Sequence, residues 1–127
     1  MSIKKITLTA MLLTIIPTVT LAEVDYDYTN PEHKADNTCV GVLSLVRDAL
    51  FGDIDNIDTS MLIQRISPNS TLAEFRNEMT DKQNGYILKY NSRSQFNHHY
   101  RATKVLVKNR YAARGMDYLT EELTKCL

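Results

Sequence analysis

Glycine is scarce in this 127-residue chain, which contains only four, and no glycine-rich loop of the kind that cradles phosphate is present. None of the serines lies in the GxSxG setting of a hydrolase nucleophile. The HExxH pattern of zinc enzymes and the CxxC spacing of redox and metal sites are missing as well. Because the common motifs for cofactor binding and catalysis are absent, we expect a protein without a cofactor and without enzymatic activity.

Long hydrophobic stretches are also lacking, since no apolar run reaches the roughly 20 residues that span a bilayer. The longest run, Ile6–Val19, follows a pair of lysines and precedes Thr20 and Ala22, which place small residues at the −3 and −1 positions of a cleavage site. This layout predicts a secretory signal peptide over residues 1–22, whose removal leaves about 105 residues and no stable membrane anchor. Its short, lysine-led form is typical of bacteria, so we expect a periplasmic or secreted protein.

Cysteine is rarer still, because Cys39 and Cys126 are the only two. An isolated pair in an exported protein usually forms a disulfide. Such a bond would tie the first helix to the last, and closing a loop of about 90 residues would stabilise the fold by roughly 4–5 kcal/mol. The alternative is a pair of free thiols, one of them reactive.

The full chain has no net charge, because 15 basic residues balance 15 acidic ones. Loss of the signal peptide removes two lysines and leaves a net charge of about −2. Residues 23–60 contain nine acidic and two basic residues, whereas residues 61–127 contain eleven basic and six acidic ones. The two halves either neutralise each other on folding or form acidic and basic surfaces that steer association with a charged partner.

Two regions follow the signal peptide. Residues 23–35 lack apolar periodicity and are predicted to be an extended, mobile N-terminal arm. Residues 36–127 contain no repeat, low-complexity run or linker and are predicted to form one helical domain. The expected fold is all-α, a small single-domain bundle of four to six helices.

The first helix is predicted from about residue 38 to residue 51. Asp36 or Asn37 is expected to cap its start, and Gly52 fits the left-handed position just after its end. Apolar side chains recur along it at intervals of three and four residues, which predicts a face turned toward the core. These residues are Cys39, Val42, Leu43, Val46 and Leu50.

Two further helices are predicted in the middle of the chain. A short one covers about residues 60–66, and the next begins with a capping box formed by Thr71 and Glu74. The Asn84-Gly85 pair is expected to interrupt or kink that helix. Tyr86–Tyr90 is interpreted as helical, with a strand as the alternative because of its aromatic and β-branched residues.

The last two helices have clear end signals. The longest helix is predicted to run from a Ser94 cap to Arg114, closed by Gly115. The final helix is predicted to begin at Met116 or Asp117.

Three aspartates after the first helix, Asp53, Asp55 and Asp58, are the nearest approach to a metal motif. A calcium loop needs an oxygen ligand at its fifth position, glycine at its sixth and glutamate at its twelfth. Ile57, Asp58 and Gln64 occupy those positions, so we expect no metal site. The aspartates are interpreted as surface acids and as candidate contacts with a protein partner, and Asp58 also as a helix cap.

The sequence contains one histidine pair, His98 and His99. Neighbouring residues on a helix point about 100° apart, which makes joint coordination of one metal by this pair difficult. A hydrolase would need one of these imidazoles beside Asp117 or Glu121 as a general acid–base set. Only proximity after folding would create that set.

Residues 101–114 contain five basic residues interleaved with tyrosine. Such a helix is either a solvated face or a binding surface for nucleic acid, an anionic membrane or an acidic protein. Export and the slightly negative net charge argue against nucleic acid. Arginine and tyrosine commonly anchor protein interfaces, so we favour a protein partner among the binding roles. The candidate contacts are Arg101, Lys104, Lys108 and Tyr111.

These features predict an exported, non-catalytic protein-binding module of the inhibitor or immunity type, which blocks a secreted toxin or an envelope hydrolase. One alternative is a periplasmic acid chaperone, because many carboxylates would lose their charge together at low pH. The other is a small hydrolase that uses His98 or His99.

Overall fold

The computed structural model describes residues 24–91 and 93–127, which form five helices and no strand. In chain order the helices are α2 (Pro31–Leu50), α3 (Thr59–Ile66), α4 (Leu72–Ile87), α5 (Arg93–Arg114) and α6 (Met116–Cys126). The prediction of an all-α bundle of four to six helices is confirmed. The predicted signal peptide lies outside the described residues. None of the described helices combines the length and the apolar character needed to cross a membrane.

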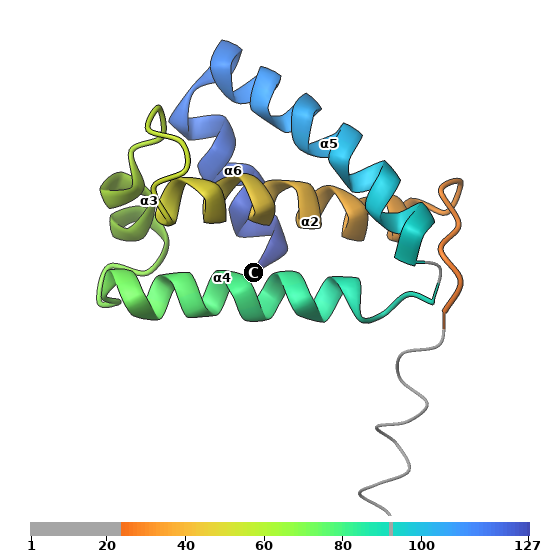
Figure 1. Ribbon diagram of the computed structural model, residues 1–127. Coiled ribbons are helices and arrows are strands. Elements are labelled where there is room, and N and C mark those ends of the chain that lie inside the picture. Colours follow the sequence, from red (N-terminus) through yellow and green to blue (C-terminus); the bar gives the residue numbers. More distant parts are fainter. Residues whose placement is uncertain (1–23, 92) are drawn as a thin grey trace, which may run out of the picture.

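α2 runs through the middle of the bundle, with α5 along one side and α4 along the other (Figure 1). A helix that is apolar on several sides is stable only when neighbours cover those sides. α2 meets that description, because five of its aliphatic side chains are at most 2 % exposed. They are Val40, Val42, Leu43, Leu45 and Val46.

α2 begins earlier than predicted. Its N-cap is Asn30, whose side-chain oxygen accepts hydrogen bonds from the amides of Glu32 and His33, and Pro31 is its first residue. Proline suits that position because its fixed φ is helical and its missing amide hydrogen would have no partner there. The predicted caps, Asp36 and Asn37, are instead buried inside the helix. The prediction that the arm extends to residue 35 is therefore wrong.

The end of α2 confirms the predicted role of Gly52. This glycine has a φ of 82°, and its amide donates to the carbonyl of Ala49, while the amide of Asp53 donates to Asp48. Together these bonds form a Schellman motif, which satisfies the last carbonyls of the helix. The motif turns the chain toward α3.

The starts of α3 and α4 also agree with the sequence. The Asp58 side chain accepts a hydrogen bond from the amide of Met61 at 3.0 Å, so Asp58 caps α3. Thr71 and Glu74 form the predicted capping box, with reciprocal bonds of 3.1 Å and 2.8 Å. Both caps are local, because the residues that form them are three positions apart.

α4 passes through Gly85 without interruption, so the predicted break at Asn84-Gly85 is wrong. Gly85 is exposed, and a Cβ added there would meet no atom within 4 Å. The helix ends at Ile87, and Tyr90 then forms an isolated bridge with Val24. The segment predicted as helix or strand is therefore a helix end followed by a turn.

α5 begins at Arg93, which places Ser94 inside the first turn and not at the cap. It ends at Arg114, and Gly115 follows with a φ of 80°, as predicted for the residue that separates α5 from α6. α5 lies close to α2 at Gly41, where an added Cβ would lie 3.1 Å from the amide nitrogen of Lys104. The absence of a side chain at Gly41 thus allows the two backbones to approach.

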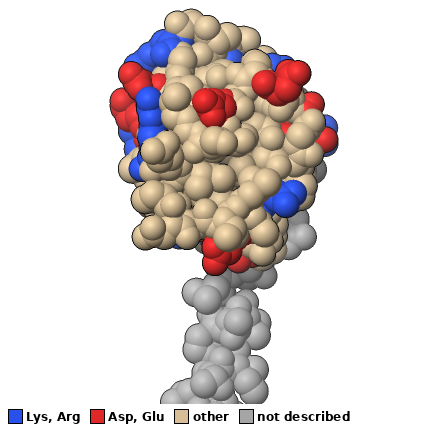
Figure 2. Space-filling view, turned by 90° about the vertical axis from the view of Figure 1, so that its left-hand side faces the viewer, with Lys and Arg blue, Asp and Glu red and all other residues tan. Residues whose placement is uncertain are grey.

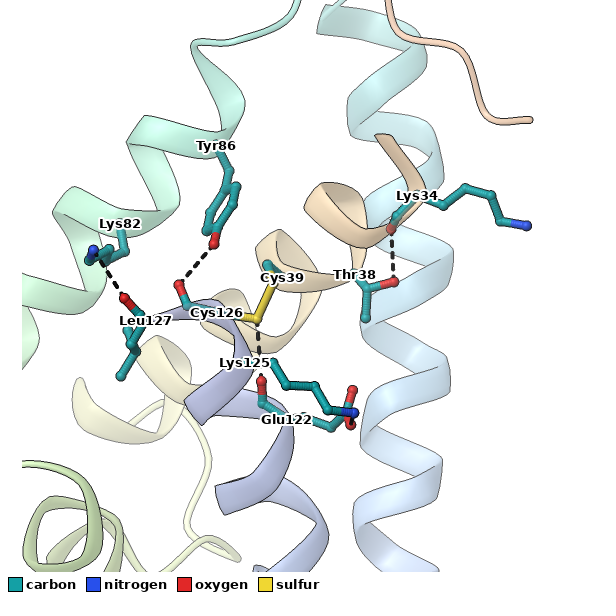
Figure 3. The surroundings of a disulfide bond; sticks show 9 residues. All are labelled: Lys34, Thr38, Cys39, Lys82, Tyr86, Glu122, Lys125, Cys126 and Leu127. Atoms are coloured by element: carbon teal, nitrogen blue, oxygen red, sulfur yellow. Dashed lines mark hydrogen bonds and ion pairs between the residues drawn. A yellow bond between two sulfur atoms is a disulfide. The ribbon is translucent and has the colours of Figure 1, made fainter. Parts of the chain in front are cut away.

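Cys39 in α2 and Cys126 at the end of α6 form the predicted disulfide, with Cα atoms 5.4 Å apart (Figure 3). Side chains of α4 also donate hydrogen bonds to the C-terminal end of the chain. The Tyr86 hydroxyl donates to the carbonyl of Cys126 at 2.9 Å, and the Lys82 ammonium donates to the carbonyl of Leu127 at 3.4 Å. The end of α6 is therefore held by two other helices, α2 and α4.

The buried side chains form two clusters. The larger one lies among all five described helices and includes Phe75, Met79, Leu119 and Leu123, each completely buried. The smaller one lies at the other end of α2 and consists of Tyr26, Val40, Tyr90 and Phe96. The smaller cluster joins the N-terminal arm to α2 and α5.

Candidate protein-binding surface

The candidate residues of α5 share one side of the helix. Arg101, Lys104, Lys108 and Tyr111 are separated by three and four positions, the spacing that aligns side chains along an α-helix. We call these four residues the basic stripe. Over its whole length α5 contains six basic residues and no acidic one, so it carries no negative charge of its own.

The basic stripe is anchored to the rest of the bundle at two points. The Lys104 ammonium pairs with the Asp48 carboxylate of α2 at 2.5 Å. The Tyr111 hydroxyl donates to the carbonyl of Asn56 at 2.6 Å. Arg101 and Lys108 are exposed and have no ion pair among the described residues. These two cations are therefore available to a partner.

The bond to Asn56 brings the acidic loop beside the basic stripe. Asp53 and Asp55 in this loop are exposed, and Asp58 caps α3. Figure 2 views the end of the molecule that carries α3 and shows acidic side chains at separate places on a largely uncharged surface. No group of three potential metal ligands exists among the described residues. One hydrogen bond thus connects the basic stripe to the loop that carries the aspartates.

Apolar side chains extend the surface of α5. Val105 is 58 % exposed and Leu106 is 46 % exposed. Scattered exposed aliphatic residues are normal on a protein surface. On the same helix as basic residues that form no ion pair with any described residue, however, these side chains offer a partner apolar surface that charged residues alone do not provide.

The histidines and Asp117 lie at opposite ends of α5. His99 stacks on Tyr28, with ring centroids 5.4 Å apart, and His98 is exposed. Asp117 pairs with Arg65 at 2.9 Å, beyond the opposite end of α5 from the histidines. In the part of the chain that the structure describes, no hydrogen bond joins either imidazole to a carboxylate. The hydrolase alternative stays a prediction.

The structure also reveals a buried polar group that sequence reasoning missed. The side chain of Asp36, which is 11 % exposed, accepts hydrogen bonds from the Tyr90 hydroxyl at 2.5 Å and the Lys89 ammonium at 2.6 Å. Burial, reinforced by the bond to this carboxylate, raises the pKa of Tyr90 far above its usual value. More than 50 residues separate the partners, so no local pattern links them.

Three tyrosines, two of them buried and one partly buried, make the stability of the fold sensitive to alkali. Burial is the main cause that raises the pKa of Tyr26, Tyr86 and Tyr90 above the usual value of 10. The unfolded chain therefore ionises first, and the stabilising contribution is complete below about pH 10 and is lost as the pH rises further. We expect the free energy of unfolding, measured with urea at a series of pH values, to fall above that point. Tyr90→Phe should make the fall shallower, and an unchanged slope would contradict this origin.

Comparisons with protein-family models, with curated proteins and with solved structures each find no match to this chain.

Proposed function

We propose that this chain is an exported, non-catalytic protein-binding module of the bacterial periplasm, of the inhibitor or immunity type, which blocks a toxin or an envelope hydrolase. The basic stripe is the observation that carries the proposal. It presents two cations that form no ion pair with any described residue, on a helix that contains no acidic residue. A surface of this kind favours an acidic partner and accelerates the encounter by electrostatic steering.

The stripe has the rigidity that an inhibitory surface needs. Lys104 and Tyr111 are both held by contacts outside α5, and Gly41 lets the helix pack closely on α2. A surface that is ordered before binding loses less conformational entropy when the complex forms. Blocking then requires only that the stripe and the adjacent acidic loop cover the active site of the partner.

Charge reversal on the stripe tests the proposal. The tagged chain is exported in its own host, captured from the envelope, and analysed by mass spectrometry, after which the affinity for the recovered partner is measured. We expect Lys108→Glu to weaken that affinity by at least about tenfold, because like charges facing each other across an interface are strongly unfavourable. Arg101→Glu should have a similar effect.

Arg110→Glu is the matched control. It makes the same charge change on the same helix, but two residues along a helix correspond to a rotation of about 200°, so that Arg110 lies outside the stripe. Its affinity for the partner should stay within about twofold of the original. Equal losses for Lys108→Glu and Arg110→Glu would show a general charge effect, and no loss in either would remove the stripe from the interface.

The second candidate function, an acid chaperone, is favoured by one observation. The Asp36 carboxylate links α2 to Lys89 and Tyr90, so one buried ion pair joins the first helix to the turn after α4. An acid chaperone would loosen and expose apolar surface at about pH 3. An unchanged near-ultraviolet circular dichroism spectrum and oligomeric state at that pH would eliminate this alternative.

A further inference from the structure

The N-terminal arm, residues 24–30, buries one side chain in the bundle. Tyr26 is only 7 % exposed, whereas its immediate neighbours face solvent. The backbone contributes a second attachment, because the carbonyl of Val24 accepts a hydrogen bond from the amide of Asn91 at 2.7 Å. The arm is thus an extended segment with a single buried anchor.

Four aromatic side chains surround that anchor, and we call them the aromatic box: His33, Tyr90, Phe96 and His99. The rings of Tyr90 and Phe96 meet Tyr26 edge-on, with centroids 5.6 Å and 5.1 Å away. His33 stacks on it at 6.1 Å, and His99 lies at 5.5 Å in a tilted arrangement. Edge-to-face geometry is the one that aromatic quadrupoles favour. The box therefore suits an aromatic side chain.

Two walls of the box, Tyr90 and Phe96, are positioned by contacts that do not involve the arm. Their rings stack on each other at 4.9 Å, and the Tyr90 hydroxyl is bonded to Asp36. The carbonyl of Phe96 accepts a hydrogen bond from the side-chain amide of Asn37 at 3.1 Å. Because these contacts do not depend on Tyr26, we expect this half of the box to persist when the arm leaves, whereas His33 and His99 lose their contacts with Asp27 and Tyr28.

The surroundings of the box suit an acidic segment. The side-chain amide of Asn91 donates to the Asp25 carboxylate at 3.3 Å, and the backbone amide of Asp27 donates to Nδ1 of His33 at 2.9 Å. A hollow of about 300 Å³ opens beside the box, between the arm, α2 and α5. Lys34 lines this hollow and has no ion pair within the described residues.

We propose that the aromatic box is a binding site for an extended, acidic segment of the partner protein that carries an aromatic anchor, and that the arm occupies this site in the free chain. The arm has that chemistry, since aspartates flank Tyr26. The inference deepens the proposed function and rests on it for the source of the segment. α5 connects the two sites, because it carries both Phe96 and the basic stripe.

Occupation by the arm lowers the affinity for the partner. A covalently attached segment acts at a high effective concentration, so a segment from outside binds only in the fraction of molecules whose arm has left. The partner must therefore displace Tyr26, and the arm excludes segments that bind the box weakly.

The test uses the full chain with Tyr26→Ala, which empties the box, and a synthetic peptide with the arm sequence Val-Asp-Tyr-Asp-Tyr-Thr-Asn. Binding is followed by the chemical shifts of the box residues. We expect saturable binding to Tyr26→Ala, at least about tenfold tighter than to the unmodified chain. The same peptide with alanine in place of its first tyrosine should not bind.

Tyr28→Ala is the comparison variant on the same arm. Tyr28 is 57 % exposed and stacks on His99 at 5.4 Å, so its loss removes one contact of a box residue but leaves Tyr26 in the box. This variant should bind the peptide less tightly than Tyr26→Ala does. Tyr26→Leu keeps an apolar anchor and is used if circular dichroism shows that Tyr26→Ala is unfolded. A folded Tyr26 variant that shows no saturable shifts would overturn the inference.

The outcome is separable from that of the proposed function. Peptide binding to Tyr26→Ala depends on the box alone and requires no knowledge of the partner. If the peptide fails to bind while Lys108→Glu still lowers the affinity for the partner, the proposed function stands and the box is only structural. If the peptide binds but charge reversal has no effect, the box is a binding site and the stripe is not.

Discussion

Replacing both Cys39 and Cys126 with alanine is expected to lower the free energy of unfolding by about 4–5 kcal/mol. The disulfide joins residues 87 positions apart, so it closes nearly the whole folded region into one loop. Cross-linking distant residues reduces the conformational entropy of the unfolded chain, and the effect grows with loop length. Since small domains have a total stability of about 5–15 kcal/mol, the variant should be close to its unfolding threshold at physiological temperature.

Urea unfolding with and without a reducing agent measures this effect. The reductant should destabilise the unmodified chain by the same amount as the double substitution and should leave the double variant unchanged. A loss below about 1 kcal/mol would mean that the unfolded chain keeps residual structure that already limits its entropy. Tyr86 and Lys82 would then be the main contacts that hold the C-terminus.

Phe96→Ala should lower the free energy of unfolding by about 3–5 kcal/mol, the usual loss for a buried phenylalanine. Phe96 is completely buried and stacks on Tyr90, while its other face meets Tyr26 edge-on. Removing the ring leaves a cavity between α2 and α5 and takes away one wall of the aromatic box. The variant should therefore also release the arm, which hydrogen exchange at Asn91 would report, because that amide is bonded to Val24.

Val105→Ala is the matched control for this prediction. It truncates an apolar residue of the same helix, but one that is 58 % exposed, so the change in stability should stay within about 0.5 kcal/mol. If Phe96→Ala were as mild as Val105→Ala, the smaller cluster would not be a packed core. The arm would then be held by its backbone contacts alone.

Signals confined to a few neighbouring residues were enough to predict much of the fold. Asp58, the Thr71–Glu74 capping box, Gly52 and Gly115 all act within one helical turn, and each is confirmed. Apolar spacing at three and four residues likewise predicted the helical class. The start of α2 was misplaced because Asn30 and Pro31 lie in a segment without apolar periodicity. The predicted break at Gly85 does not occur, because packing along the rest of α4 outweighs the weak helix propensity of glycine.

The candidate site likewise has features that neighbouring residues predict and features that depend on contacts between distant residues. The candidate contacts on α5 were predicted from the basic residues and tyrosine that one predicted helix carries, since these residues are close in sequence. Their place beside the acidic loop was not predicted, because the Tyr111–Asn56 bond joins residues 55 positions apart. The aromatic box gave no signal at all, since its rings come from α2, α5 and the turn after α4.

The sequence by itself determined the helical class, most helix ends and the charge of α5, because each depends on neighbouring residues. It also determined the disulfide, because two cysteines can form only one bond within the chain. Only the tertiary structure decided that Asp36 is a buried acceptor and not a helix cap, and that Tyr26 lies in a box of four rings. These features arise when helices pack and bring distant residues into contact. Apolar periodicity shows that a face is buried, but it does not show which residues meet there.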